Sequence, residues 1–167
     1  MHVTDTFRRL QTLGLSVAQR LACLGPLIAR FTIGVAFIDS GWGKVHNLEK
    51  VTAYFTELGI PAPQIQATFV SWVELVCGSL VLVGLGTRLA AIPLIGTMVV
   101  ALLTAKASDI SGISDLVGTI EFTYIALLVV LALGGAGAVS LDRLLARRLA
   151  ASAAPAPRAG ALGSSSV

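Results

Sequence analysis

The chain has 167 residues, of which 55% are hydrophobic and 13% are charged, and its formal net charge is +3. A mean hydropathy of +0.85 lies above the range of soluble globular domains, so the composition indicates a one-domain integral membrane protein. The basic excess does not indicate a nucleic-acid partner, because the arginines and lysines gather beside apolar segments and form no stripe with aromatic residues.

Residues 1–22 are predicted to form an amphipathic helix on the cytoplasmic membrane surface. Apolar side chains recur at helical spacing at positions 10, 13, 17 and 21, with arginines spread between them. The segment does not have the pattern of a conventional signal peptide, because no A-x-A-type cleavage site follows a short apolar run.

The first predicted crossing runs from residue 24 to residue 43 and carries Arg30 and Asp39 within an apolar run. A charge at the bilayer centre costs about 2.5–3.5 kcal/mol, whereas each large apolar residue returns only about 0.3–0.6 kcal/mol. The apolar residues of this segment do not comfortably offset two charges. We therefore expect Arg30 to have a partner within the protein.

The connection over residues 47–64 is predicted to contain an interfacial helix. Leu48, Val51, Phe55 and Leu58 lie on one helical stripe. Gly59 is expected to end this helix, and the prolines that follow are expected to keep the chain extended.

Three further crossings are predicted over residues 66–83, 89–105 and 119–139. Residues 84–88 are so short a connection that the second and third crossings form an antiparallel hairpin. Residues 106–118 form a polar connection to the fourth crossing. The fold class predicted is an all-α membrane protein, a four-helix transmembrane bundle with short amphipathic interfacial helices.

The chain is thus divided into a surface segment (1–22), a transmembrane domain (23–145) and a disordered tail rich in Ala, Pro, Gly and Ser (146–167). One predicted side holds arginines 8, 9, 20, 88, 143, 147, 148 and 158, and the other holds three lysines among acidic residues. The positive-inside rule makes the arginine-rich side cytoplasmic. An even number of crossings places both termini there.

Arg30 and Glu74 are predicted to form an intramembrane ion pair. At 1.5 Å rise per residue, their backbones are expected to differ in height by under ~10 Å, which a long arginine can span. Each partner then removes most of the other's desolvation cost. This pair either locks the bundle or lines a polar pocket that binds a quinone head group or passes protons.

Asp39 and Glu121 are expected nearer the outer surface, where they can exchange partners with Lys44 and Lys106 or simply reach the interface. No metal site is predicted, since His2 and His46 are the chain's two histidines and both lie outside the crossings.

Several motifs, taken in order, resemble the DoxX family of small bacterial membrane proteins over residues 24–145. They are Arg30…Gly34…Gly41-Trp42-Gly43-Lys44, Phe55-x-x-Leu58-Gly59-Ile60-Pro61-x-Pro63, Glu74-x-x-x-Gly78, Gly84-x-Gly86-Thr87-Arg88, Glu121, and Gly134-Gly-Ala-Gly137-Ala-Val-Ser140-Leu141-Asp142. In the last of these motifs, Ala136 stands where the family often has proline.

The resemblance implies a four-helix bundle in the bacterial inner membrane, similar to the small subunit of thiosulfate:quinone oxidoreductase. A mycobacterial relative is linked to a complex with a sulfurtransferase and a superoxide dismutase. Carried onto this sequence, the functional positions are Arg30, Lys44, Glu74, Arg88 and Glu121. From its position alone, Arg88 is a charge of the cytoplasmic turn.

Three functions follow as hypotheses. The first is a non-catalytic membrane subunit or scaffold of a redox or oxidative-stress complex, with protein partners or further copies of itself. The second is a quinone-linked oxidoreductase subunit in which Arg30, Glu74 and Glu121 line the head-group pocket. The third is a small proton-coupled transporter, which internal repeats or broken helices would favour. Membrane lipids are partners in all three.

Overall fold

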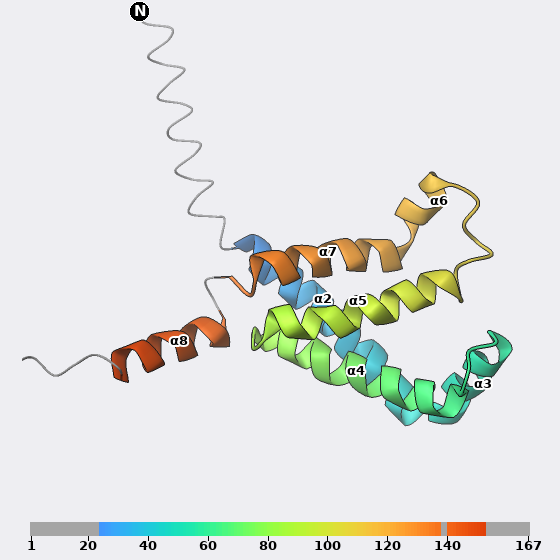
Figure 1. Cartoon of the computed structure of the whole chain (residues 1–167), viewed down its shortest axis with the longest axis horizontal. Helices are drawn as coiled ribbons and strands as arrows, with labels where there is room; N and C mark the ends of the chain where they lie inside the picture. Colours follow the sequence, from blue (N-terminus) through green and yellow to red (C-terminus); the bar gives the residue numbers. More distant parts are fainter. Residues whose placement is uncertain (1–23, 138–139, 153–167) are drawn as a thin grey trace, which may run out of the picture.

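A computed structural model describes residues 24–137 and 140–152, and this part of the chain is helical without strands. The long helices are α2 (Leu24–His46), α4 (Pro63–Val83), α5 (Thr87–Leu103) and α7 (Ile120–Gly134). They lie side by side as a bundle, with α3 (Leu48–Glu57) and α6 (Ile113–Gly118) at one end and α8 (Leu141–Ser152) at the other (Figure 1). The predicted surface helix over residues 1–22 lies outside the described residues.

Two of these helices, α2 and α4, are long and apolar enough to cross a membrane. The other two are apolar but shorter, with 17 residues in α5 and 15 in α7. At 1.5 Å rise per residue they span about 25 Å and about 22 Å, against a hydrocarbon core of about 30 Å. The all-helical prediction is confirmed for the described residues, and four crossings stay a prediction.

The helices α2 and α4 touch along a seam of glycines. A Cβ atom added at Gly34 would lie 2.6 Å from Cβ of Leu82, and one at Gly41 would lie 2.5 Å from the backbone nitrogen of Leu75. Gly78 of α4 meets α2 in the same way. Gly34 and Gly41 of α2 therefore allow close approach of α4. The seam also fixes the antiparallel register of the two helices.

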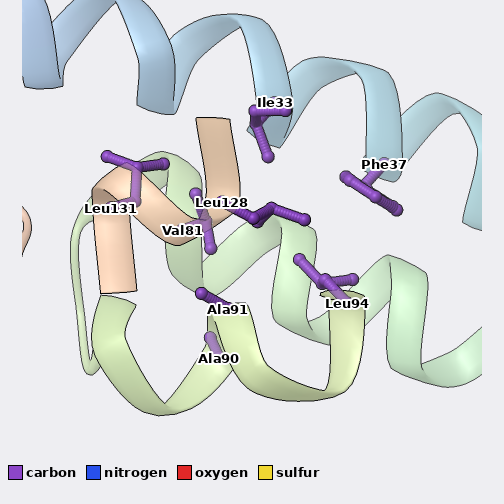
Figure 2. Close-up of a cluster of buried hydrophobic side chains, with 8 residues drawn as sticks. All are labelled: Ile33, Phe37, Val81, Ala90, Ala91, Leu94, Leu128 and Leu131. Atoms are coloured by element: carbon purple, nitrogen blue, oxygen red, sulfur yellow. The ribbon is translucent and has the colours of Figure 1, made fainter. Parts of the chain in front are cut away.

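A small apolar core lies between the four long helices (Figure 2). Its buried members are Ile33, Phe37, Val81, Ala90, Ala91, Leu94, Leu128 and Leu131. Lipid tails are as apolar as leucine, so in a bilayer the contact between these side chains, more than the removal of water, holds the helices together. The small residues Ala90 and Ala91 of α5 are buried in this core, and α5 packs against α7.

The predicted interfacial helix is present as α3. Its stripe of Leu48, Val51 and Phe55 is half-buried, and the helix packs against α4. The chain turns at Gly59, whose φ of +69° is readily adopted by glycine. The helix α4 begins earlier than predicted because Pro63 occupies its first position, where the missing amide hydrogen is not needed.

The polar connection over residues 106–118 contains a short helix, α6, which the sequence analysis did not predict. Asp115 accepts hydrogen bonds from the hydroxyl and backbone amide of Ser111 and from the amide of Gly112. The hydrogen bond from the Ser111 hydroxyl is the largest cause of a lowered Asp115 pKa. The carboxylate therefore caps amides that lack partners at the start of the helix.

Other helix ends also differ from the predicted boundaries, and α5 spans Thr87–Leu103 where the third crossing was predicted over 89–105. The first crossing continues as helix to His46, past the predicted end at residue 43. The fourth predicted crossing, 119–139, ends as helix at Gly134, because Gly135 has a φ of +78°. The tail was predicted to begin at residue 146, but α8 continues to Ser152 because its leucines and arginines favour a helix. Residues 153–167 lie outside the described part.

Candidate functional site

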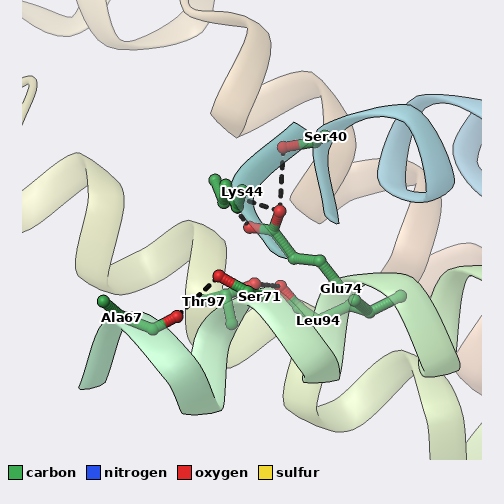
Figure 3. A network of polar contacts seen from close by, with 7 residues as sticks. All are labelled: Ser40, Lys44, Ala67, Ser71, Glu74, Leu94 and Thr97. Atoms are coloured by element: carbon green, nitrogen blue, oxygen red, sulfur yellow. Dashed lines mark hydrogen bonds and ion pairs between the residues drawn. The ribbon is translucent and has the colours of Figure 1, made fainter. Parts of the chain in front are cut away.

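One polar centre lies between α2 and α4 and joins Ser40, Lys44 and Glu74 (Figure 3). The Lys44 ammonium lies 2.5 Å from Oε1 and 2.6 Å from Oε2 of Glu74, and the Ser40 hydroxyl donates to Oε2 at 2.8 Å. The Glu74 side chain is 1% exposed and that of Lys44 is 29% exposed. This carboxylate is therefore neutralised and hydrogen-bonded within the bundle.

The glycine seam explains how this centre is assembled. Ser40 and Lys44 are four residues apart and therefore share one face of α2. Gly41 lies against the backbone of Leu75, so the neighbouring Glu74 is brought directly under the two polar side chains. Two nearby hydroxyls donate hydrogen bonds to backbone carbonyls of their own helices. Ser71 donates to Ala67 O at 2.6 Å and Thr97 to Leu94 O at 2.8 Å (Figure 3).

A second polar centre surrounds Arg30 near the opposite end of the bundle. Its guanidinium donates to the carbonyls of Val81 at 3.0 Å, Leu82 at 2.8 Å and Ala136 at 2.9 Å. The side chain is 3% exposed. Val81 and Leu82 lie in the last turn of α4, where carbonyls have free acceptor capacity and attract positive charge. The Val81 carbonyl also accepts from the Gly84 amide at 3.1 Å. Arg30 thus ties α2 to α4 and to the segment after α7.

Gly84 makes room for this guanidinium. Its φ is +75°, and a Cβ atom there would lie 2.6 Å from Cζ of Arg30. Both the backbone conformation and the space therefore require glycine at this turn. The first glycine of the Gly84-x-Gly86-Thr87-Arg88 motif is explained by Arg30.

The predicted Arg30–Glu74 pair is wrong. Glu74 pairs with Lys44, and the hydrogen bonds of Arg30 described above end on backbone carbonyls. Arg30 precedes Lys44 by 14 residues of one helix, which is about 21 Å at 1.5 Å rise per residue. The register of the glycine seam places Glu74 beside Lys44, so the gap to Arg30 exceeds the reach of an arginine.

Arg88 lies at the same end of the bundle as Arg30, in the first turn of α5. Its side chain is exposed and donates to Leu133 O at 3.3 Å. Beside it, Asp142 accepts from the Gly86 amide at 2.9 and 3.0 Å, and the Asp142 amide donates to Gly84 O at 3.1 Å. Asp142 therefore fastens α8 to the α4–α5 turn. This role was not predicted from the sequence, although Asp142 ends the last family motif.

Glu121 and Asp39 do not take the partners considered for them. Lys44 binds Glu74, and Lys106 lies 3.3 Å from Asp109. Glu121 is in the first turn of α7, and its Oε2 is buried without a hydrogen-bond partner among the described residues. Asp39 is exposed on the side of α2 that faces away from the bundle.

Within the described ranges, no group of three or more His, Cys, Asp or Glu side chains can hold a metal ion.

The candidate site consists of the Ser40–Lys44–Glu74 centre, the Arg30 centre, and the two carboxylates Asp39 and Glu121. Ser40 was not predicted, and its only sequence signal is its spacing of four residues from Lys44.

Two helices long and apolar enough to cross a membrane, with an ion pair buried between them, are typical of an integral membrane protein. The chain belongs to the DoxX family, whose family model matches residues 25–107. Similar proteins include "Putative oxidoreductase CatD" of Bacillus subtilis, 31% identical over 121 residues, covering 71% of this chain and 85% of that protein.

Two further relatives are membrane proteins by name. The uncharacterized membrane protein Rv3486 of Mycobacterium tuberculosis is 33% identical over 133 residues, covering 73% of this chain and 82% of its own length. The inner membrane protein YqjF of Escherichia coli is 28% identical over 130 residues, covering 78% of this chain and 98% of its own length. No solved structure matches the chain.

Proposed function

We propose that this protein is a membrane subunit or scaffold of a redox or oxidative-stress complex in a bacterial inner membrane. The relative named as an oxidoreductase supports a redox setting. The bundle's own charges support a scaffold, because Glu74 is neutralised by Lys44 and Arg30 holds backbone carbonyls. These contacts stabilise the four-helix arrangement and leave the outward faces of the helices for partners.

The observation that carries the proposal is the exposure of Asp39 within α2. Asp39 shares an outward stripe with Phe31, Val35 and Trp42, which are 65%, 44% and 59% exposed. It lies seven residues before the end of the helix at His46, about 10 Å inside that end at 1.5 Å rise per residue. A carboxylate facing lipid at this depth is unfavourable by up to ~3 kcal/mol. A basic side chain of a partner helix would remove this cost.

The first prediction concerns this carboxylate. Asp39→Asn is expected to lower the recovery of a partner at least tenfold, because breaking a buried charge pair costs roughly 2–5 kcal/mol. The measurement is purification from native membranes in mild detergent, with the partner recognised by flavin, haem or iron–sulfur absorbance and by mass spectrometry.

Glu57→Gln is the matched control, because it removes an exposed carboxylate from α3 outside the crossings. It should leave recovery unchanged. Equal recovery with Asp39→Asn, or a wild-type preparation that contains only lipid, would contradict the subunit proposal.

Four crossings with the α8 end in the cytoplasm are part of the proposal. Arg88, Arg143, Arg147 and Arg148 belong to that end. The other end carries Lys44, which is paired within the bundle, and two further lysines among several acidic residues. The positive-inside rule supports this orientation.

A second candidate, a quinone-linked oxidoreductase subunit, is favoured by Glu121. Glu121 shares a stripe of α7 with Tyr124, Leu128 and Leu131, spaced as the residues of one helical face. Leu128 and Leu131 are core residues, and the Tyr124 ring lies 5.7 Å from that of Phe37. The unpartnered Oε2 therefore lies on the inward side of α7, where a quinone head group could hydrogen-bond to it. Arg30 does not belong to this pocket, since it lies toward the opposite end.

The second prediction follows from this candidate. Glu121→Gln should reduce co-purifying quinone and electron transfer to quinone at least tenfold in native membranes, while helix content and expression stay the same. A tenfold loss corresponds to ~1.4 kcal/mol, the size expected of one hydrogen bond to a charged group. Glu57→Gln is again the control. Wild-type quinone content and activity in Glu121→Gln would exclude the pocket.

The transporter hypothesis stays a prediction. The broken helices that would favour it are not found in the part of the chain that the structure describes, where α2, α4, α5 and α7 are continuous.

A further inference from the structure

The helix α8 extends away from the end of the bundle and is fastened to it by its first turn (Figure 1). Its leucines at positions 141, 144, 145 and 149 are exposed and lie on one side of the helix, at i, i+3, i+4 and i+8. Arg143 and Arg147 lie on the opposite side, separated by one helical turn. A helix of this pattern at the end of a membrane bundle is suited to the lipid–water interface.

A hollow of about 450 Å³ lies between α8 and the ends of α2 and α4. Its walls combine apolar side chains of the bundle, Leu27 and Leu82, with Leu144, Arg143 and Arg147 of α8. The hollow therefore follows the boundary between the leucine side and the arginine side of α8. Such a boundary places two guanidinium groups at the level where the apolar helices end.

We propose that this hollow binds an anionic phospholipid, with the head-group phosphate between Arg143 and Arg147 and an acyl chain along Leu27 and Leu82. Arginine matches phosphate oxygens in pairs of hydrogen bonds, and two arginines favour a head group of net negative charge over a zwitterionic one, whose ammonium group offsets the phosphate charge. The leucines of the same wall contact apolar chain, which a free anion lacks. The neighbouring leucines of α8 then lie in the interface.

This site extends the subunit proposal without depending on it. It rests on the position of α8 at the end of the bundle, on the exposure of its leucines and on the charge of the hollow.

The test titrates delipidated full-length protein in mild detergent with phosphatidylglycerol or phosphatidylcholine of the same acyl chains, and counts retained lipids by native mass spectrometry. Phosphatidylglycerol should be retained preferentially. Arg143→Gln and Arg147→Gln should each weaken its retention about fivefold, and the double variant about 25-fold, which corresponds to ~1 kcal/mol per basic residue.

Arg148→Gln is the matched control, because Arg148 belongs to the same helix and is exposed but does not line the hollow. It should change retention less than about twofold, which is well below the fivefold loss, or ~1 kcal/mol, expected for a direct contact. All three side chains are exposed, so circular dichroism should report unchanged helix content. Equal retention of the two lipids, an equal loss with Arg148→Gln, or displacement of phosphatidylglycerol by inorganic phosphate would overturn the proposal.

Discussion

Arg30→Ala is expected to lower the free energy of unfolding by about 3 kcal/mol or more. The variant removes hydrogen bonds to the carbonyls of Val81, Leu82 and Ala136, and hydrogen bonds that involve a charged group contribute roughly 1.5–3 kcal/mol each. It also leaves a cavity beside Gly84 that a Cβ atom cannot fill. For a chain of this size the midpoint of thermal unfolding in detergent should fall by roughly 6–12 °C.

Two variants make this measurement specific. Arg30→Lys should retain only part of the stability, because a single ammonium cannot donate to three carbonyls in the geometry of a guanidinium. Arg148→Ala, which removes an exposed arginine from α8, should leave the midpoint nearly unchanged. If the midpoint of Arg30→Ala lies within about 2 °C of the wild type, the loss in free energy of unfolding is less than ~1 kcal/mol. That result would show that Arg30 does not lock the bundle.

Lys44→Met should be comparably destabilising, by roughly 3–5 kcal/mol, because it leaves the Glu74 carboxylate buried without its cation. Adding Glu74→Leu should restore most of the lost stability, since replacing both members of a buried pair by apolar residues is often neutral or stabilising. The four proteins form a double-mutant cycle whose coupling free energy isolates the pair.

The pair of Lys106 and Asp109 supplies the control cycle. These side chains are 41% and 60% exposed and lie 3.3 Å apart, so their coupling should be below about 1 kcal/mol. If the Lys44–Glu74 coupling is no larger, the pair has no structural role. The double variant also separates functions, because a scaffold should keep its partner whereas a protein that moves protons through Glu74 should lose activity.

The sequence was sufficient to predict which residues are unusual. An arginine and a glutamate within apolar runs are recognisable without a structure, and both proved to be buried in the bundle. The spacing of Leu48, Val51 and Phe55 likewise predicted the packed face of α3. These features depend on local periodicity and on the cost of burying charge. Both can be recognised from the types of residues and their spacing.

The partners of those residues could not be predicted from the sequence, for physical reasons. Arg30 binds backbone carbonyls, and every residue of the chain carries one, so no side-chain pattern identifies them. Lys44 was expected at the outer surface as a partner for Asp39 or Glu121, beyond a crossing that ended at residue 43, whereas the helix continues to His46. The register of α2 against α4 depends on which glycines touch, and that emerged only from the packed helices.

The lengths of the long helices have a consequence for the surrounding lipid in the four-crossing arrangement proposed above. The helices α2 and α4 match an ordinary bilayer, whereas α5 and α7 fall short of it by roughly 5–8 Å. Acyl chains beside the shorter pair must therefore compress, while those beside the longer pair need not. The protein would then be surrounded by a membrane of uneven thickness, and a partner with short helices would bind most readily on the thin side.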